Sequence, residues 1–159
     1  MDEALRLAEL LTTRLCHDLA GPINTLTGAL ELAAEDAEAA GEALPLAEDA
    51  AMSLARRLKL VRMAWGGGGA AQSAADLREL AAGLQGSKLR LDFDGLVPDA
   101  VFPPAVARVV LNVLLLGAEC LRMGGTLRLA GDPEGDMIVT IDGPRAAWPP
   151  GFAALLANP

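Results

Sequence analysis

Apolar residues recur at spacings of three and four between residues 11 and 33, which is the pattern of one face of an α-helix. Acidic residues in the first turn suit the positive end of a helix dipole. The pattern predicts a first helix from Asp2 to about Ala40, and the glycine- and proline-containing residues 41–45 are expected to break it. The apolar stripe of this helix consists of Leu11, Leu15, Leu19, Ile23, Leu26, Leu30 and Ala33.

A second amphipathic helix is predicted to follow this break and to end at about Trp65. Two long helices joined by a short turn form an antiparallel hairpin. One hairpin cannot bury two complete apolar stripes, so we expect two copies of the chain to pair into a four-helix bundle. The second stripe consists of Ala47, Ala50, Ala51, Leu54, Leu58, Val61 and Trp65.

A run of four glycines at residues 66–69 follows the predicted hairpin. It lacks the lysine and the strand–helix context of a phosphate-binding loop. Residues 66–72 are therefore predicted to form a flexible linker between a hairpin domain at residues 1–65 and a second domain at residues 73–159.

The pattern after the linker alternates between helices and strands, which predicts a small α/β sandwich and an α+β fold for the whole chain. Ser73 resembles the first residue of a capping box, and Pro103 precedes a nearly continuous apolar run. The expected elements are a helix at 74–84, a strand at 88–94, a helix at 104–123, a two-stranded hairpin at 126–130 and 137–141, and a short helix at 151–157.

His17 is the only histidine of the chain, and it lies about 200° around the first helix from both Leu15 and Leu19. An isolated histidine is more often a packed or incidental surface residue than a functional one. Here, however, the ring projects from a face of mostly small or polar residues, which allows another protein to approach closely. Pro22 removes one helical hydrogen bond and is expected to bend the helix just past His17. Apart from Leu10, the residues on this face are Thr13, Gly21, Asn24 and Gly28.

The chain has 159 residues, a net charge of −8 and a pI near 4.6, which argues against nucleic acid and anionic membrane surfaces as partners. No apolar run reaches the length of a membrane span, and the Met1-Asp2-Glu3 start lacks the basic residues of a signal peptide. The two cysteines are too few for a disulfide framework. We therefore expect a cytoplasmic protein.

Cys16, His17 and Asp18 are consecutive, so on a helix their side chains point about 100° apart and cannot converge on one metal ion. The same geometry argues against a Cys–His nucleophilic pair. Phosphorylation of the imidazole needs only an exposed ring nitrogen and a neighbour that orients the other nitrogen, and Asp18 is a candidate for that neighbour.

The run from Leu15 to Ile23, with a histidine, an acidic residue and a proline, resembles the H-box of sensor histidine kinases. It is most similar to that of ChpT-type histidine phosphotransferases. The resemblance implies a kinase-shaped homodimer that relays phosphoryl groups without binding ATP or another cofactor. It makes His17 the carrier and Asp18 the residue that orients it, while a partner receiver domain supplies the acceptor aspartate and its Mg²⁺.

The second domain occupies the place of the ATP-binding domain of a histidine kinase, which the sequence resembles in a degenerate and truncated form. Residues 109–118 resemble the family's N-box helix and keep Asn112, but the second asparagine is replaced by Leu116 or, with a shift of one residue, by Gly117. Neither residue can coordinate Mg²⁺. After the last strand, Asp142 is not followed by the spaced glycines that normally accompany adenine recognition.

Counting back from the predicted turn places the basic end of the second helix alongside residues 22–28. Each arginine at this end of the second helix could simply belong to a solvated basic face. As a cluster in an acidic protein, however, these arginines suggest contact with an acidic partner. The predicted partner-binding residues are Arg14, Gly21, Asn24, Gly28, Arg56, Arg57 and Arg62.

The sequence thus predicts a histidine phosphotransferase that passes phosphoryl groups between response-regulator receiver domains. Three alternatives remain open at this point. The chain could be a module that binds a response regulator without being phosphorylated, an ATP-dependent histidine kinase fragment, or a helical dimer with no role in signalling.

Overall fold

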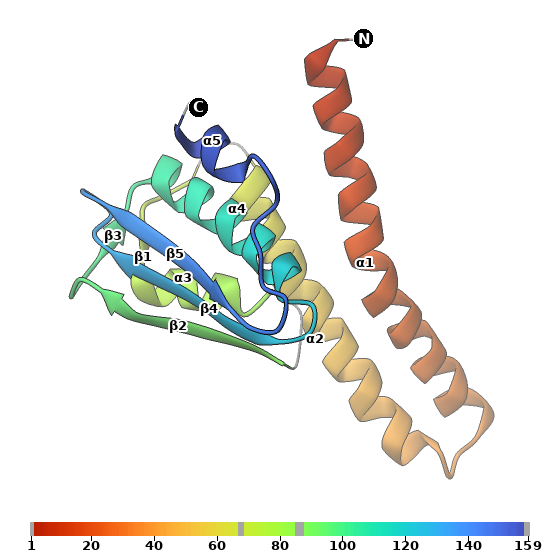
Figure 1. Cartoon of the computed structure of the whole chain (residues 1–159). Helices are drawn as coiled ribbons and strands as arrows, with labels where there is room; N and C mark the ends of the chain where they lie inside the picture. The colour runs from red at the N-terminus through yellow and green to blue at the C-terminus, as the bar shows by residue number, and fades with distance from the viewer. Residues whose placement is uncertain (1, 67–68, 85–87, 158–159) are drawn as a thin grey trace. The chain divides into compact units, whose positions relative to one another are not determined.

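The computed structural model describes residues 2–66, 69–84 and 88–157, and its elements give an α+β protein. The chain divides into two compact units, Met1–Leu58 and Lys59–Pro159. Figure 1 shows the helical hairpin of the first unit and the mixed α/β layers of the second. None of the described helices is both long and apolar enough to cross a membrane.

The hairpin consists of α1 (Glu3–Glu35) and α2 (Ala40–Trp65). The Asp2 side chain caps α1 by accepting a hydrogen bond from the backbone N–H of Ala4 at 3.2 Å. Helix α1 continues through Pro22 without interruption. The bend expected just past His17 stays a prediction.

The turn between the helices lies earlier than residues 41–45, where the sequence predicted it. Asp36 ends α1 in an extended conformation, and its side chain accepts hydrogen bonds from the backbone N–H groups of Glu38 and Ala39 at 2.8 and 3.3 Å. Gly41 and Pro45 instead lie within α2. Pro45 lies only about one turn after the start of α2, where few helical hydrogen bonds are lost. The carbonyl group that it leaves without a helical partner is that of Gly41, which is exposed to water. The predicted end of the first helix at Ala40 was therefore wrong.

Small side chains dominate the buried part of the hairpin. Ala29 on α1 is buried, as are Ala43, Ala47 and Ala50 on α2. Many of the larger apolar residues remain about half exposed in a single chain, which leaves considerable apolar surface uncovered. These residues are Leu5, Leu7, Leu10, Ile23, Leu30 and Leu32 on α1 and Leu44, Leu46, Met52 and Leu58 on α2.

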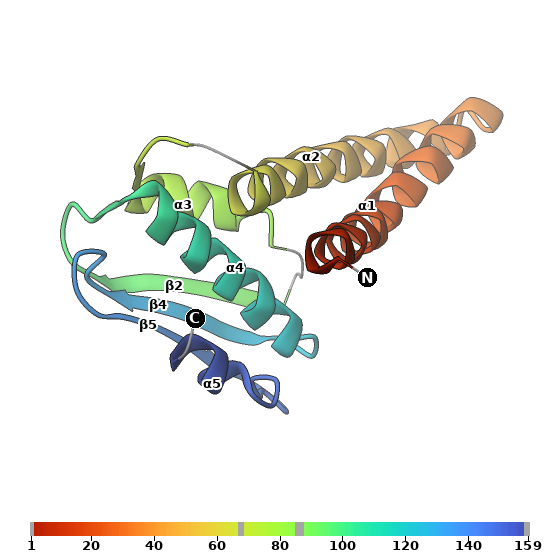
Figure 2. The same cartoon turned by 90° about the horizontal axis from the view of Figure 1, so that it is seen from above.

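The second unit is built on a three-stranded sheet with the strand order β2-β4-β5. The strands are β2 (Leu89–Leu96), β4 (Gly125–Gly131) and β5 (Met137–Asp142). β2 and β4 run parallel and are connected through α4 (Pro104–Cys120), while β4 and β5 form an antiparallel hairpin. In Figure 2, α4 and α3 (Ala74–Ala81) lie over one face of this sheet.

Two shorter features complete this unit. The Ser73 side chain accepts a hydrogen bond from the Asp76 N–H while the Asp76 side chain accepts one from the Ser73 N–H, so the predicted capping box at the start of α3 is confirmed. A two-stranded antiparallel sheet, which the sequence analysis missed, joins β1 (Gln72–Ser73) to β3 (Val101–Phe102). The chain closes with α5 (Phe152–Ala157).

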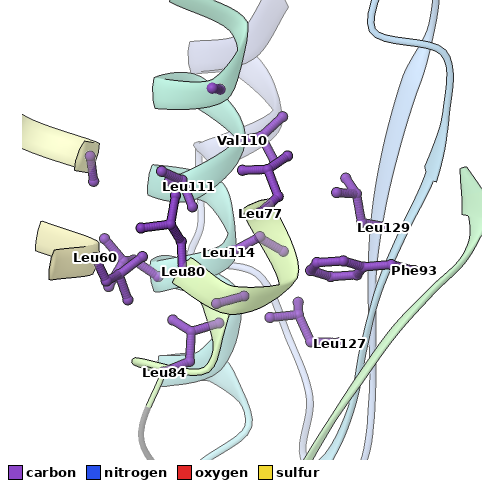
Figure 3. Packing of buried hydrophobic residues seen from close by; sticks show 14 of the residues in the cluster. Leu60, Leu77, Leu80, Leu84, Phe93, Val110, Leu111, Leu114, Leu127 and Leu129 are labelled. Atoms are coloured by element: carbon purple, nitrogen blue, oxygen red, sulfur yellow. The ribbon is translucent and has the colours of Figure 1, made fainter. Parts of the chain in front are cut away.

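The core of the second unit fills the space between these helices and the sheet (Figure 3). The last turns of α2 contribute Leu60 and Ala64 to it, so this end of the helix is part of the second unit. Of the predicted linker at residues 66–72, residues 67 and 68 lie outside the described chain, and Gln72 belongs to β1. The largest fully buried side chains are Phe102, Leu60, Leu77, Leu111, Leu114, Leu127 and Leu129.

Candidate functional site

His17 lies in the middle of α1, and its side chain is 85% exposed. The exposure expected from its angular position is thus confirmed. Gly21 and Gly28 are open, because a Cβ atom added at either position would meet nothing within 4 Å, and Asn24 is exposed. The face around the imidazole therefore presents little side-chain bulk to an approaching protein.

Asp18, the next residue, has the opposite environment. Its side chain is only 8% exposed, and it is held by two arginines. Arg57, from the facing helix α2, donates a hydrogen bond from its Nη2 to Oδ2 of Asp18. Arg14, one turn earlier on α1, places its Nε 3.0 Å from both carboxylate oxygens. The Asp18 carboxylate is thereby fixed by groups from both helices of the hairpin.

The two carboxylate oxygens of Asp18 have different surroundings. Oδ2 receives Arg57, whereas Oδ1 lies 3.5 Å from Nδ1 of His17. This separation is longer than an ordinary hydrogen bond, and catalytic hydrogen bonds often tighten only when the reaction partner is bound. Asp18 approaches Nδ1 and so leaves Nε2 as the ring nitrogen available to a partner.

The arginines also decide the charge of Asp18. Burial by itself raises the pKa of a carboxyl group, but the hydrogen bonds and positive charges of Arg57 and Arg14 outweigh it and lower the pKa of Asp18 below its usual value. Asp18 is therefore an anion at neutral pH, beside an exposed imidazole.

The position of Arg57 differs from the prediction that it belongs to an exposed docking surface. Its side chain is 7% exposed, and it lies opposite Asp18 rather than opposite residues 22–28. The reason is the turn at Asp36. Because the chain reverses several residues earlier than predicted, each residue of α2 faces a residue of α1 that lies roughly nine residues, or two to three turns, closer to the N-terminus. A correct position for the turn would have indicated this pairing from the sequence.

The other predicted docking residues are distributed as follows. Arg56 is exposed on α2, next in the chain to the buried Arg57. Arg14 is partly buried against Asp18. Arg62 is exposed but belongs to the second unit, where it lines a cavity of about 280 Å³ with Lys59, Asp76 and Glu79. The structure therefore brings Arg14 and Arg57 together at Asp18 and does not place Arg62 in that cluster.

Asn112, the retained asparagine of the N-box-like helix, is used within the second unit. Its Oδ1 accepts a hydrogen bond from Nε1 of Trp65 at 2.9 Å. Its Nδ2 donates to the carbonyl oxygens of Ala64 and Arg108 at 3.0 and 2.8 Å. Both ends of the amide thus connect α4 to the end of α2 rather than facing an open site.

Gly117, one of the two positions that could correspond to the second asparagine, is tightly packed. A Cβ atom there would lie 2.6 Å from Cδ1 of Leu127 and 3.2 Å from the Trp148 ring. No side chain larger than hydrogen fits at this position without displacing its neighbours. Leu116, the other candidate position, lines a cavity of about 550 Å³ between α4 and α5 that is mostly apolar.

Among the described residues, no group of three or more His, Cys, Asp or Glu side chains is arranged to hold a metal ion. The site on the hairpin consists of an exposed imidazole, a buried carboxylate and two arginines.

The exposed His17 lies on a helical hairpin that is joined to an α/β unit, and comparison with known proteins identifies the class of protein. Residues 74–159 match the model of the histidine phosphotransferase C-terminal domain. The chain belongs to the histidine phosphotransferase family.

Two relatives extend this match to nearly the whole chain. The chain is 30% identical to protein phosphotransferase ChpT of Brucella abortus (strain 2308), over 96% of its own length and 75% of that protein. It is also similar to a solved structure described as a bacterial phosphotransferase, with a TM-score of 0.77 and 28% identity over 99% of this chain and 77% of the other. The ChpT-type resemblance inferred from the H-box is confirmed.

Proposed function

We propose that this protein relays phosphoryl groups between response-regulator receiver domains, with His17 as the carrier. The observation that supports this most directly is the pairing of an exposed imidazole with a buried, ionised carboxylate in a member of the histidine phosphotransferase family. A phosphoaspartate on one receiver is the donor in this proposal, and an aspartate on a second receiver is the final acceptor.

The proposed transfer starts with neutral His17 carrying its proton on Nδ1. The lone pair of Nε2 attacks the phosphorus of the acyl phosphate, a P–N bond forms, and the P–O bond breaks with its electron pair leaving on the receiver carboxylate. The phosphorylated ring is a cation as long as Nδ1 keeps its proton. Transfer to the second receiver is the reverse of this step, with the new carboxylate as the nucleophile.

Asp18 supports this chemistry in two ways. Its Oδ1 is the group nearest to Nδ1, so it favours the tautomer that leaves the Nε2 lone pair free. Its negative charge also stabilises the cationic ring that exists between the two transfers. The Mg²⁺ needed at the acyl phosphate is expected on the receiver, and we propose no cofactor for this chain.

We further propose that the working form is a homodimer in which two hairpins make a four-helix bundle. The support is the apolar surface that a single hairpin leaves exposed, which includes Ile23 and Leu30 of the stripe on α1. The predicted hairpin domain at residues 1–65 supplies this dimerisation surface as well as the phosphotransfer site.

The absence of ATP binding is also part of the proposal, with the unit that follows the predicted linker acting as a degenerate kinase-like domain. Asn112 is engaged by Trp65, Ala64 and Arg108, and the packing around Gly117 leaves no room for a metal-binding side chain. The protein then depends on receiver domains for its phosphate and works with them in the cytoplasm, without nucleic-acid or membrane partners.

Phosphate transfer from an isotopically labelled receiver tests the relay. Wild-type protein should take up the label and pass it to a second receiver, and His17→Ala should take up none. Receiver affinity and molecular mass, measured on the same samples, should be unchanged in the variant. Uptake by His17→Ala would disprove the role of His17.

The same experiment separates two of the alternatives from the relay. A receiver-binding module that is not phosphorylated would bind the receiver with no transfer of label to the wild-type protein. An ATP-dependent kinase would instead acquire label from ATP in the absence of any receiver.

A further inference from the structure

Arg57 takes no direct part in the transfer steps proposed for His17. It is a nearly completely buried arginine in the hairpin, and it forms an ion pair with Asp18, the residue next to His17. Its Nε finds no acceptor among the described protein atoms. A buried arginine with one N–H unsatisfied is poorly optimised for stability, because an apolar side chain of similar size would pack there without that cost.

The geometry assigns to Arg57 a positioning role in phosphoryl transfer: from the facing helix it holds Oδ2 of Asp18, so that Oδ1 faces Nδ1 of His17. This inference rests on the proposed function of His17. Arg57 is a positioning residue because its hydrogen bond is to Asp18, and none of its described contacts is with the imidazole.

The Asp18 side chain can rotate about its Cα–Cβ and Cβ–Cγ bonds, so a partner on α1 alone restrains it only from its own helix. Arg14 supplies that restraint and lies at equal distances from both oxygens. Arg57 contacts Oδ2 from the other helix, so it distinguishes the two oxygens and fixes the plane of the carboxylate.

The charge of Arg57 adds a second consequence. Among the described residues, the titratable and charged groups in contact with Asp18 are Arg14 and His17 on α1 and Arg57 on α2. Burial raises the pKa of Asp18, and both arginines lower it. Without Arg57, only Arg14 would counteract the effect of burial, so the pKa of Asp18 should rise. Asp18 would then take up a proton at a higher pH than in the wild-type protein, and the protonated carboxyl would no longer orient the tautomer that His17 needs.

The experiment measures single-turnover transfer from a labelled receiver at saturating receiver concentration, from about pH 5 to pH 8. In Arg57→Met, which keeps the length of the side chain, the transfer rate at pH 8 should fall about tenfold, and it should fall further relative to wild type as the pH decreases. Arg57→Lys, which keeps the charge and a donor, should recover part of the rate. Arg6→Met is the control, because it removes one positive charge from an exposed position of α1 and should leave the rate and its pH dependence unchanged.

A double-mutant cycle decides whether Arg57 acts through Asp18. In the Asp18→Asn background, Arg57→Met should cause little further loss, since its target is already gone. If instead the two losses multiply, Arg57 contacts the phosphoryl group or the receiver directly and the positioning role is wrong. A purely structural role would lower stability but leave the rate and pH dependence of the folded protein as in wild type, which would also overturn the proposal.

The measurements on wild-type protein and on Arg57→Met distinguish a failure of the relay from a failure of the role of Arg57. If wild-type protein accepts no phosphate, the relay itself fails. If wild-type protein accepts phosphate and folded Arg57→Met matches it at every pH, only the role of Arg57 fails. Should Arg57→Met not fold, Arg57→Gln retains an N–H donor without the charge, and the same rate and pH comparison applies to it.

Discussion

Arg57 on α2 donates a hydrogen bond to Asp18 on α1, so that the residue next to the exposed His17 is held by a charge from the facing helix. This pairing connects the fold of the hairpin to the chemistry proposed for it. The same contact that brings the two helices together also orients the carboxylate beside the imidazole.

Removing the charge of Asp18 should destabilise the hairpin in a pH-dependent manner. Asp18→Asn leaves the buried Arg57 without its counter-ion, and we expect a loss of about 2–3 kcal/mol at neutral pH, measured by urea unfolding at a fixed protein concentration. The pKa of Asp18 is lowered in the folded protein, so its contribution is complete above the ordinary value of 3.8 and is lost as the pH falls below it. The difference between wild type and variant should therefore shrink below about pH 4. A difference that stays constant to lower pH would show that Asp18 does not carry this dependence.

Dimerisation through the apolar stripe of α1 can be tested with two exposed leucines. Leu30 lies on the stripe, whereas Leu32 lies about 200° away on the same helix, and both are roughly half exposed in the single chain. We expect Leu30→Glu to give a monomer by light scattering at micromolar concentration, while Leu32→Glu stays dimeric. A wild-type protein that is a folded monomer under these conditions would contradict the proposed bundle.

The exposed Arg56 should support receiver docking by electrostatic attraction, because a receiver's phosphorylation site is a cluster of carboxylates. Arg56→Glu is expected to weaken receiver binding about three- to tenfold, and the wild-type affinity should fall as salt is added. Arg90→Glu, an equal charge change at an exposed position of β2, is the control. If both variants bind equally well, docking does not depend on Arg56.

Two helical glycines should respond in opposite ways to alanine. Gly117→Ala places a methyl group against Leu127 and should cost about 1–3 kcal/mol of unfolding free energy. Gly28→Ala faces open space and should raise stability by about 0.5–1 kcal/mol through its higher helix propensity. If Gly28 belongs to the receiver-facing surface, the same methyl group should weaken receiver binding. Equal effects of the two substitutions on stability would contradict the packing described at α4.

Calorimetry tests the proposal that this protein does not bind ATP. Titration of the protein with millimolar ATP and Mg²⁺ should give no heat beyond dilution, because Asn112 is engaged within the fold and no second asparagine accompanies it. A saturable heat, or label acquired from ATP alone, would favour the kinase alternative.

The sequence alone determined the elements whose cause is local. The 3.6-residue periodicity of Leu11 to Ala33 predicted α1 and the exposure of His17, and the Ser73 capping box marked the start of α3. The H-box indicated the family, since its histidine, acidic residue and proline are adjacent in the chain. Each of these features depends on residues within a few turns of one another.

Only the tertiary structure decided which distant residues meet. The sequence predicted the turn at residues 41–45, but Asp36 accepts hydrogen bonds from the N–H groups that follow it, and the chain reverses there instead. A displacement of the turn by a few residues changes the partner of every residue across a hairpin by twice that number. Arg57 therefore lies against Asp18 and is buried, although its sequence context is that of an exposed basic cluster. Local patterns fix helices because their hydrogen bonds are local, whereas the register between helices depends on the packing and capping of the whole hairpin.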